Sequence, residues 1–352
     1  SAAPAMAMWD LGRLAAASDD LNALFDEGYA GLHERLLGSD SPDAARFLAA
    51  FDDFSFRYGC RGPNEWETRS PTWETEPDLA LAAIDRMRLS DEAAAPRRHN
   101  AERAAEREAI GVEIAAMLAG KPDDQQKFQA ALHSATVFMP GRERTTTNNI
   151  KLVQELRVAL NEFGRRRVAD GTFHKANDFG LLTRAELLEA IDDAGKFTAA
   201  LAEREALLDE VAALQEPFLF HGGRPDMSTY PRRDAVEMTP VIGGEAVKGV
   251  PGCPGVARGI ARVVLDSHDP TALAPGDILV APITDPSWTP LFVPAAGVVV
   301  DVGAPLSHAI IVSRELGIPC VVSATDATKR IPDGATIEVD GDTGVVTIIE
   351  LP

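Results

Sequence analysis

The carboxy-terminal third of the chain places short apolar runs between turn residues. Residues 298–300 are three consecutive valines, and residues 318–322 form a second apolar run. Such runs are typical of strands buried on both faces of a sheet. Between them, Ser307 is a favoured helix N-cap residue, so the spacing predicts a helix over 308–315. This strand–helix–strand unit puts His308 at the carboxyl end of its first strand, the edge where open α/β sheets bind ligands.

Before about residue 240 the apolar residues recur at helical intervals instead. Residues 101–119 are rich in Ala, Glu and Arg, which are strong helix formers, and Gly120 ends them. Leu and Phe recur every three or four positions over 148–168, and two further helices are expected over 183–194 and 196–215. This half of the chain is therefore predicted to be helical.

A stretch that contains several Pro and Gly residues, over about 225–247, separates these two patterns and suits a linker. We therefore expect an α+β multidomain protein, with a helical N-terminal domain over 1–240 and an α/β domain over 247–352. The length of 352 residues agrees, because it exceeds that of a typical single core.

Composition narrows the classes of partner. The 54 Asp and Glu residues outnumber the 34 Lys and Arg residues and give a net charge of −20, which disfavours nucleic acid and membrane surfaces. Cys60, Cys253 and Cys320 are scattered without paired spacing, so we expect no disulfide framework or zinc site and a reducing, cytoplasmic setting. The chain shows no apolar stretch long enough to span a bilayer, and we expect no signal peptide because its opening lacks a basic region and a sufficient apolar one. Because it opens without Met, we expect a fragment of a longer polypeptide or a tag remnant.

His308 is the strongest candidate for chemistry. The first turn of a helix leaves backbone N–H groups unpaired and carries the positive end of the helix dipole, so a phosphate dianion is stabilised there. The imidazole would supply the nucleophile, while the Ser307 hydroxyl and the N–H groups of Ala309 and Ile310 would hold the phosphate oxygens. The alternative is that this histidine only caps the helix or is a satisfied polar group.

Several separated segments resemble one known family in the same order along the chain. They are residues 254–264, residues 276–280, the loop Thr284-Asp285-Pro286 and the pair Ser307-His308. Together they resemble the phosphohistidine swivelling domain of the phosphoenolpyruvate-utilising enzymes, which include dikinases, phosphoenolpyruvate synthases and rifampin phosphotransferases. The segment Ala304-Pro305-Leu306 departs from the commonest family pattern and favours the rifampin-phosphotransferase-like branch.

The resemblance implies roles for individual residues. His308 would be the residue that is phosphorylated, and Thr284 or Asp285 would orient its ring from the facing loop. The domain would swing to carry phosphate between distant sites.

Two patches in the helical half are further candidates. The segment around Arg61-Gly62-Pro63-Asn64-Glu65 resembles an Arg-Gly-Pro-containing segment of the same branch, which would place Arg61 and Glu65 at an acceptor or phosphate. The alternative is a structural ion pair that pins the loop. For residues 142–151 we favour helix N-capping by clustered hydroxyls and amides over an anion site at Arg144 and Lys151.

No segment resembles the ATP-grasp domain of these enzymes, a glycine-rich phosphate loop or a set of metal-ligating carboxylates. The resemblance thus implies a phosphotransferase chain that is inactive alone. An ATP-grasp domain or subunit would supply ATP and Mg²⁺, a small-molecule acceptor would receive the phosphate, and the chain itself would bind no metal or cofactor. Two alternatives are a non-catalytic binding or regulatory module and, more weakly, a hydrolase that uses Ser307 with His308.

Overall fold

The computed structural model of the chain describes residues 3–92, 95–215, 217, 220–233, 244–265, 267 and 272–352. Contacts divide the chain into two compact units, one of residues 1–151 with 240–352 and one of residues 152–239. Residues 234–243 of the expected linker lie outside the described residues. The expected boundary near 240–247 does separate the helices from the strands along the chain. In space, however, the helices of residues 1–151 and the strands of residues 240–352 pack into one compact unit.

The first unit opens with five helices around a core of aromatic side chains. The Phe25 and Phe47 rings meet edge to face with centroids 5.5 Å apart, and Phe54 lies 5.7 Å from Trp73. The helices are α1 (Ala3–Ala16), α2 (Asp19–Asp26), α3 (Leu32–Leu37), α4 (Pro42–Tyr58) and α5 (Pro77–Leu89). The loop between α4 and α5, residues 59–76, carries Arg61 and Glu65.

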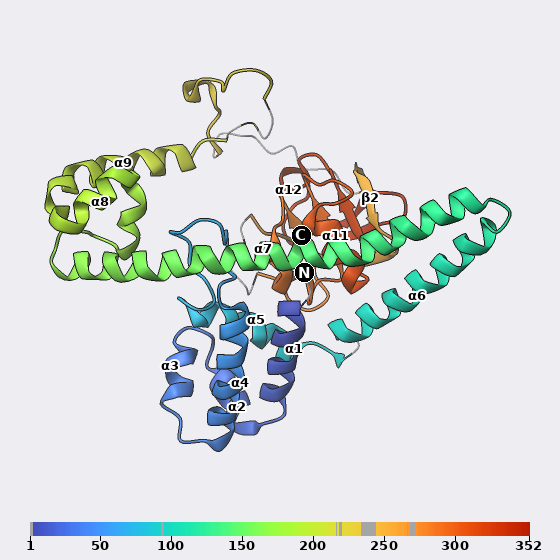
Figure 1. Cartoon of the computed structure of the whole chain (residues 1–352), viewed down its shortest axis with the longest axis horizontal. Coiled ribbons are helices and arrows are strands. Elements are labelled where there is room, and N and C mark those ends of the chain that lie inside the picture. The colour runs from blue at the N-terminus through green and yellow to red at the C-terminus, as the bar shows by residue number, and fades with distance from the viewer. Residues whose placement is uncertain are drawn as a thin grey trace. The chain divides into compact units, whose positions relative to one another are not determined.

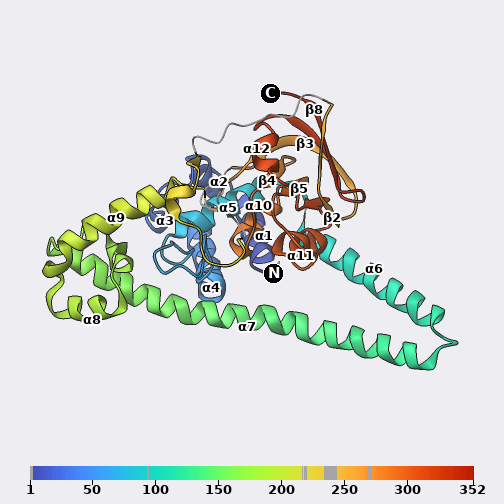
Figure 2. The same cartoon turned by 90° about the horizontal axis from the view of Figure 1, so that it is seen from above.

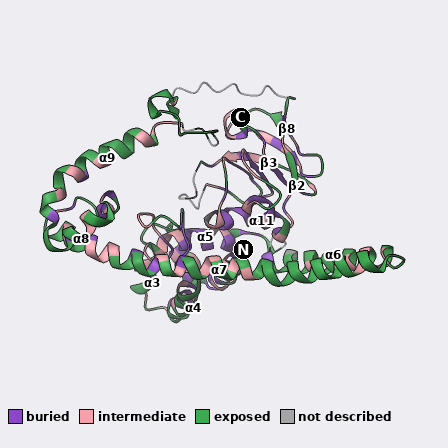
Figure 3. Ribbon diagram, turned by 45° about the horizontal axis from the view of Figure 1, so that its top comes forward, coloured by how far each residue is buried: buried purple, intermediate pink, exposed green. Residues whose placement is uncertain are grey.

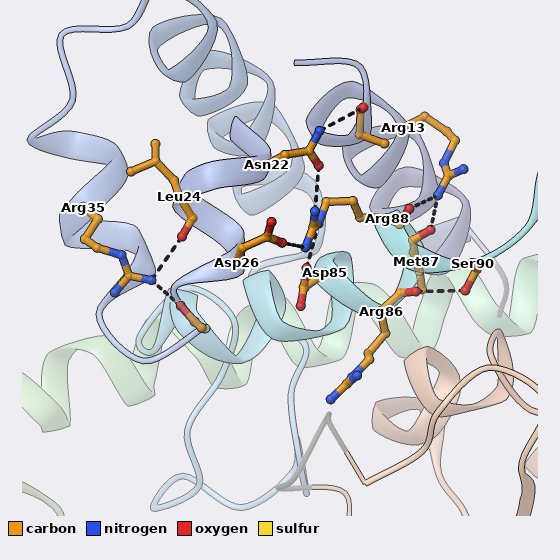
Figure 4. A network of polar contacts seen from close by, with 12 residues as sticks. Arg13, Asn22, Leu24, Asp26, Arg35, Asp85, Arg86, Met87, Arg88 and Ser90 are labelled. Atoms are coloured by element: carbon orange, nitrogen blue, oxygen red, sulfur yellow. Dashed lines mark hydrogen bonds and ion pairs between the residues drawn. The ribbon is translucent and has the colours of Figure 1, made fainter. Parts of the chain in front are cut away.

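Arg88 ties these helices together through the contacts drawn in Figure 4. Its guanidinium donates to Asn22 Oδ1 (2.6 Å), Asp26 Oδ1 (2.7 Å) and Asp85 Oδ1 (2.8 Å), which links the end of α5 to α2. Arg13 of α1 donates to the carbonyls of Met87 and Arg88, which satisfies carbonyls at the carboxyl end of α5. These bonds fix the helical layer that carries loop 59–76.

Two long helices follow, α6 (Pro96–Met117) and α7 (Pro122–Ala169). They diverge from a short turn at residues 118–121, close to which the Gln125 side chain donates to the carbonyl of Ala115 at 3.4 Å (Figures 1 and 2). The surface of α6 is almost wholly exposed (Figure 3). The expected helices over 101–119 and 148–168 are confirmed as parts of α6 and α7.

The N-capping expected for residues 142–151 is wrong, because α7 runs through them without a break. Their threonines bond back to the preceding turn instead: Thr145, Thr146 and Thr147 donate to carbonyls four residues earlier at 3.0–3.1 Å. Pro140 lies inside the helix, where sequence rules expect a boundary.

The second unit adds further helical elements to the last part of α7. They include η2 (Ala176–Leu181), α8 (Arg184–Asp193), η3 (Ala194–Phe197) and α9 (Thr198–Ala212). Thr183 and Glu186 form a capping box that starts α8. Phe173, Phe179 and Leu201 centre a small separate core. The two helices expected over 183–194 and 196–215 are therefore confirmed.

The rest of the first unit is an eight-stranded sheet in the order β1-β8-β7-β3-β4-β5-β6-β2. Strands β3, β4, β5 and β6 run parallel to one another, and the outer pairs are antiparallel. The strands are β1 (Ala246–Lys248), β2 (Val250–Cys253), β3 (Val256–Val263), β4 (Ile278–Ala281), β5 (Gly297–Val300), β6 (Cys320–Val322), β7 (Thr336–Asp340) and β8 (Val345–Glu350). Helix α11 (His308–Leu316) connects β5 to β6, which confirms the strand–helix–strand unit.

Alternate side chains of the central strands enter two different cores. Val298 and Val300 of β5 belong to the core that also contains the aromatic residues of α1–α5, whereas Val299 faces a second core built with β7 and β8. All three valines are fully buried, as the continuous apolar run predicts. One face of the sheet and the N-terminal helices therefore share a single hydrophobic core. The fold class, helices followed by an α/β sheet, is confirmed.

The remaining short elements are η4 (Met227–Thr229), η6 (Pro286–Trp288), α10 (Thr289–Phe292) and α12 (Ala327–Arg330). Within the described part of the chain, no helix is long and apolar enough to cross a membrane.

Candidate functional site

His308 is the first residue of α11 and follows the carboxyl end of β5. Ser307 has the extended N-cap conformation (φ −70°, ψ 157°), but its side chain makes no capping hydrogen bond. Its hydroxyl has no hydrogen-bond partner among the described residues. The Ser307 hydroxyl and the first N–H groups of the helix, including those of Ala309 and Ile310, are thus available to an anion at this end.

The loop before the helix requires a glycine at position 303. A Cβ added to Gly303 would lie 2.6 Å from Cβ of Val322, so the loop passes directly over β6. Ser323 secures the same loop by donating from its hydroxyl to the carbonyl of Gly303 at 2.6 Å. These contacts set the entry of the chain into α11.

Both nitrogens of the imidazole contact threonines from the facing segment between β4 and β5. Nδ1 lies 3.1 Å from Oγ1 of Thr284, and Nε2 lies 3.2 Å from Oγ1 of Thr289. Both threonines are buried. The ring of Phe292 packs edge-on to the imidazole, with centroids 5.6 Å apart. These two polar contacts and one ring contact thus fix the plane and the rotation of the ring.

The environment keeps this imidazole neutral. Burial in the first place, with a smaller contribution from the positive charge of Arg61, lowers the pKa of His308 to about 3. At neutral pH one ring nitrogen therefore carries a lone pair, which a nucleophile requires.

Thr284 is at the position expected of an orienting residue. Asp285 contributes its main-chain carbonyl to the turn at Trp288 (3.0 Å), and the second ring nitrogen contacts Thr289 rather than the expected aspartate. Sequence reasoning missed Thr289 and Phe292. The available signal was their place in the polar and aromatic segment that follows β4 at the same edge of the sheet.

Arg61 and Glu65 form a buried ion pair of 2.6 Å, and the other guanidinium nitrogen of Arg61 donates to Thr147 Oγ1 at 2.7 Å. This is the geometry of the structural alternative, a pair that pins loop 59–76. Nε of Arg61 is buried without a hydrogen-bond partner among the described residues, and the charge of Arg61 reaches His308. Of the second patch, Arg144 is exposed and Nζ of Lys151 lies 5.7 Å from the ring centre of Phe56.

The described residues contain no group of three or more His, Cys, Asp or Glu side chains that could hold a metal ion. Cys60, Cys253 and Cys320 are buried free thiols.

Comparison with known proteins assigns two parts of the chain. Residues 273–344 match the mobile domain of PEP-utilising enzymes, and residues 1–143 match the fourth domain of rifampicin phosphotransferase. The chain is 30% identical to a rifampicin phosphotransferase of Streptomyces sviceus over 88% of its length, and 33% identical to the prodigiosin synthesizing transferase PigC of Serratia marcescens over 93%. The matched regions span only 35% and 36% of those two relatives.

Proposed function

We propose that this chain, which contains a PEP-utilising enzyme mobile domain and a rifampicin phosphotransferase fourth domain, carries a phosphoryl group on His308. The group would come from an ATP-dependent partner domain or subunit and pass to a small-molecule acceptor. One observation supports the proposal most directly. A neutral imidazole with fixed ring orientation stands at the amino end of α11, where backbone N–H groups favour an anion.

In the loading step, the lone pair of one ring nitrogen attacks the terminal phosphorus of the donor in line. The N–P bond forms as the P–O bond to the leaving group breaks, and that oxygen keeps the electron pair. The amides of Ala309 and Ile310 and the unpartnered hydroxyl of Ser307 hold the phosphoryl oxygens. In the second step an acceptor oxygen attacks the same phosphorus, and the ring nitrogen leaves.

Arg61 is the cation that the helical part contributes to the transfer. Its charge reaches His308, and its Nε has no hydrogen-bond partner in the described structure. Glu65 and Thr147 hold the other two guanidinium nitrogens, which leaves Nε as the one that a phosphoryl oxygen would use. The Arg61 side chain would then form the ion pair with Glu65 and contact the phosphate at the same time, through different nitrogens.

The donor side lies on a partner. No residue group described in this chain fits a metal ion, so Mg²⁺ would enter with ATP on an ATP-grasp domain or subunit. The length of the relatives supports this assignment, because the chain spans about a third of the two named above. Their names make rifampicin and a precursor of prodigiosin the first acceptors to test.

Labelled ATP tests the proposal. The chain is incubated with an ATP-grasp-containing relative and with ATP labelled at the β or the γ phosphate. We expect acid-labile, base-stable label on the peptide that contains His308, and no label after His308→Ala. The exposed His174 supplies the matched control, since His174→Ala removes a histidine outside the site and leaves labelling unchanged.

Label that persists in His308→Ala, or an unlabelled wild-type chain with a partner that labels its own histidine domain, would overturn the proposal. The second result would favour a non-catalytic binding or regulatory module. Circular dichroism of the variant checks that its fold is intact.

A further inference from the structure

The fold brings together two cysteines that lie far apart in the sequence. Cys253 in β2 and Cys320 in β6 are Cα partners in the antiparallel ladder at one end of the sheet. Opposed residues of such a ladder have Cα atoms about 4.5–5.5 Å apart, and disulfides span about 4.4–6.8 Å between Cα atoms. The backbone spacing of this pair therefore fits a disulfide, although both residues are free thiols in the structure.

A bulge at Gly252 turns the two side chains toward the same core. The register shifts between Pro251 and Cys253, so that Gly252 and Cys253 together oppose Cys320. Without the extra residue, Cys253 would point to the other face of the sheet. Instead, Cys253 and Cys320 both belong to the core that includes the apolar side of α11, whereas Val321 faces the second core. The bulge thus makes a bond between the two sulfurs geometrically accessible.

Loss of the two S–H groups would cost the surroundings little. Sγ of Cys253 donates to the carbonyl of Ser313 in α11 at 3.5 Å, and Cys320 lies close to the side chain of the same serine. The Ser313 carbonyl also accepts from the N–H of Ile318 at 2.8 Å. It therefore keeps a donor when the Cys253 S–H is lost, and a disulfide would leave this buried acceptor satisfied.

Local opening of β2 would give a reagent access to Cys253. The strand has four residues and lies at the end of the sheet, and the residues on either side of Gly252-Cys253 are exposed. Such an edge opens at a lower free energy than the central strands. Burial raises the pKa of both thiols, that of Cys320 to about 12, while the charges of Arg103 and Arg314 act in the opposite direction on Cys253. Cys253 is therefore the better nucleophile of the two.

We propose that Cys253 and Cys320 are a modification site, at which a low-molecular-weight disulfide such as oxidised glutathione forms a covalent cross-link between β2 and β6. The Cys253 thiolate attacks one sulfur of the reagent, and the other sulfur leaves as a thiolate with the electron pair. Cys320 then loses its proton, attacks the Cys253 sulfur and expels the second thiolate. The two protein thiols are oxidised, and the reagent is reduced to two thiols that take up the two protons.

The cross-link would fasten the part of the sheet that holds α11. Nε of Arg314, in the last turn of α11, donates to the carbonyl of Gly252 at 2.8 Å. A bond between β2 and β6 also closes a long loop of the unfolded chain, which favours the folded state. Oxidation should therefore raise the thermal stability of the chain. This chemistry needs no phosphoryl donor or acceptor, so it stands apart from the proposed transfer.

Oxidation of the full chain tests the proposal. The reduced chain is incubated with oxidised glutathione at about pH 8, alkylated with N-ethylmaleimide, digested without reduction and analysed by mass spectrometry. We expect a pair of peptides joined through Cys253 and Cys320, and its loss after dithiothreitol. The midpoint of thermal unfolding should be about 5 °C higher in the oxidised chain than in the reduced one.

The third cysteine supplies the control. Cys253→Ala should abolish both the joined peptides and the gain in stability, whereas Cys60→Ala removes a buried thiol from the helical part and should leave both unchanged. In the wild type, Cys60 should stay unmodified while the cross-link forms, because the chain does not need to unfold as a whole.

Three results would overturn the proposal. Cys253 and Cys320 could stay free or each carry glutathione without joining. The cross-link could appear only as Cys60 reacts, which would mean that the pair is reached through global unfolding. The joined chain could be no more stable than the reduced one, which would mean that the bond does not fit the native ladder.

Discussion

At the scale of single residues, burial of the His308 imidazole away from water has the largest effect on the chemistry of the site, because it lowers the pKa of the ring. His308 is neutral because the folded chain removes most of its water, and the positive charge of Arg61 adds a smaller effect. Its pKa is about 3 in the folded chain against about 6.5 for an unperturbed histidine. Folding therefore competes with protonation of His308 whenever the pH falls below the pKa of an unperturbed histidine.

This competition predicts a pH dependence of stability. Above pH 6.5 His308 is neutral in both states and has no effect. As the pH falls from 6.5 toward 3, the unfolded chain binds a proton that the folded chain cannot, so the free energy of unfolding decreases. Between pH 7.5 and pH 5 the wild type should lose about 2 kcal/mol more than His308→Gln, measured by urea unfolding at both values.

The exposed His174 is again the control, because His174→Gln should lose as much stability as the wild type over this range. Equal losses in the wild type and His308→Gln would show that the folded chain does protonate the ring.

The sequence was sufficient to predict His308 as the functional residue, but it predicted only some of the residues that surround its ring. Ser307 and the amides of Ala309 and Ile310 follow from the helix start, which is a local property of the chain. Thr289 and Phe292 lie sixteen or more positions away and reach the ring only because the segment after β4 folds over the carboxyl ends of the strands. Nothing local distinguishes this threonine from one that caps its own helix.

At the scale of elements, periodicity predicted the central strands and α11 well because burial on both faces leaves a strong apolar signal. It failed on α7. Pro140 and Gly141 interrupt the helical pattern, and the polar run after them is typical of a helix start. The helix nevertheless continues, with threonine hydroxyls bonded to its own carbonyls. Local propensity is outweighed here by the cost of ending a helix between two long, favourable segments.

Substitution of alanine for two different glycines of α7 should change the stability of the protein in opposite directions. A Cβ at Gly141 would meet no atom within 4 Å, so Gly141→Ala should raise stability by about 1 kcal/mol through the lower backbone entropy of the unfolded chain. A Cβ at Gly164 would lie 1.7 Å from the carbonyl oxygen of Ala176, so Gly164→Ala should lower stability by at least about 2 kcal/mol.

Thermal unfolding followed by helical circular dichroism measures both changes. A gain from Gly164→Ala would show that α7 and the segment at Ala176 can move apart without cost. A loss from Gly141→Ala would show that the helix is broken at Pro140 in solution.

At the scale of the whole molecule, the first unit joins the sheet and the N-terminal helices through one core. Pro63 and Trp73 of loop 59–76 and Leu79 and Ala83 of α5 line a small pocket together with Ser267, Pro290 and Leu291. We call this set the seam. Helix α10, which carries Thr289, lies in the seam, so the imidazole site and the helical part are packed against each other. A domain that carries phosphate to a distant donor must separate along such a contact.

A charge placed in the seam tests this separation. Leu291 is 2% exposed, so in Leu291→Glu a carboxylate would replace a buried side chain, and exposure of the seam should relieve its desolvation. We expect the α/β part to leave the helices while keeping its strands. Small-angle scattering should then show a larger radius of gyration with an unchanged circular dichroism spectrum, and the pKa of His308 should rise from about 3 toward 6.5 as the ring gains water.

Leu79→Glu introduces the same charge from the helical side, where Leu79 is only partly buried, and should give the same expansion without touching α10. Ile283→Glu is the matched control, because Ile283 is 49% exposed next to Thr284 and lies outside the seam. Compact scattering from both seam variants, with native dichroism and an unshifted His308, would mean that the sheet and helices form one rigid body. Phosphate would then have to reach His308 without any swing of the domain.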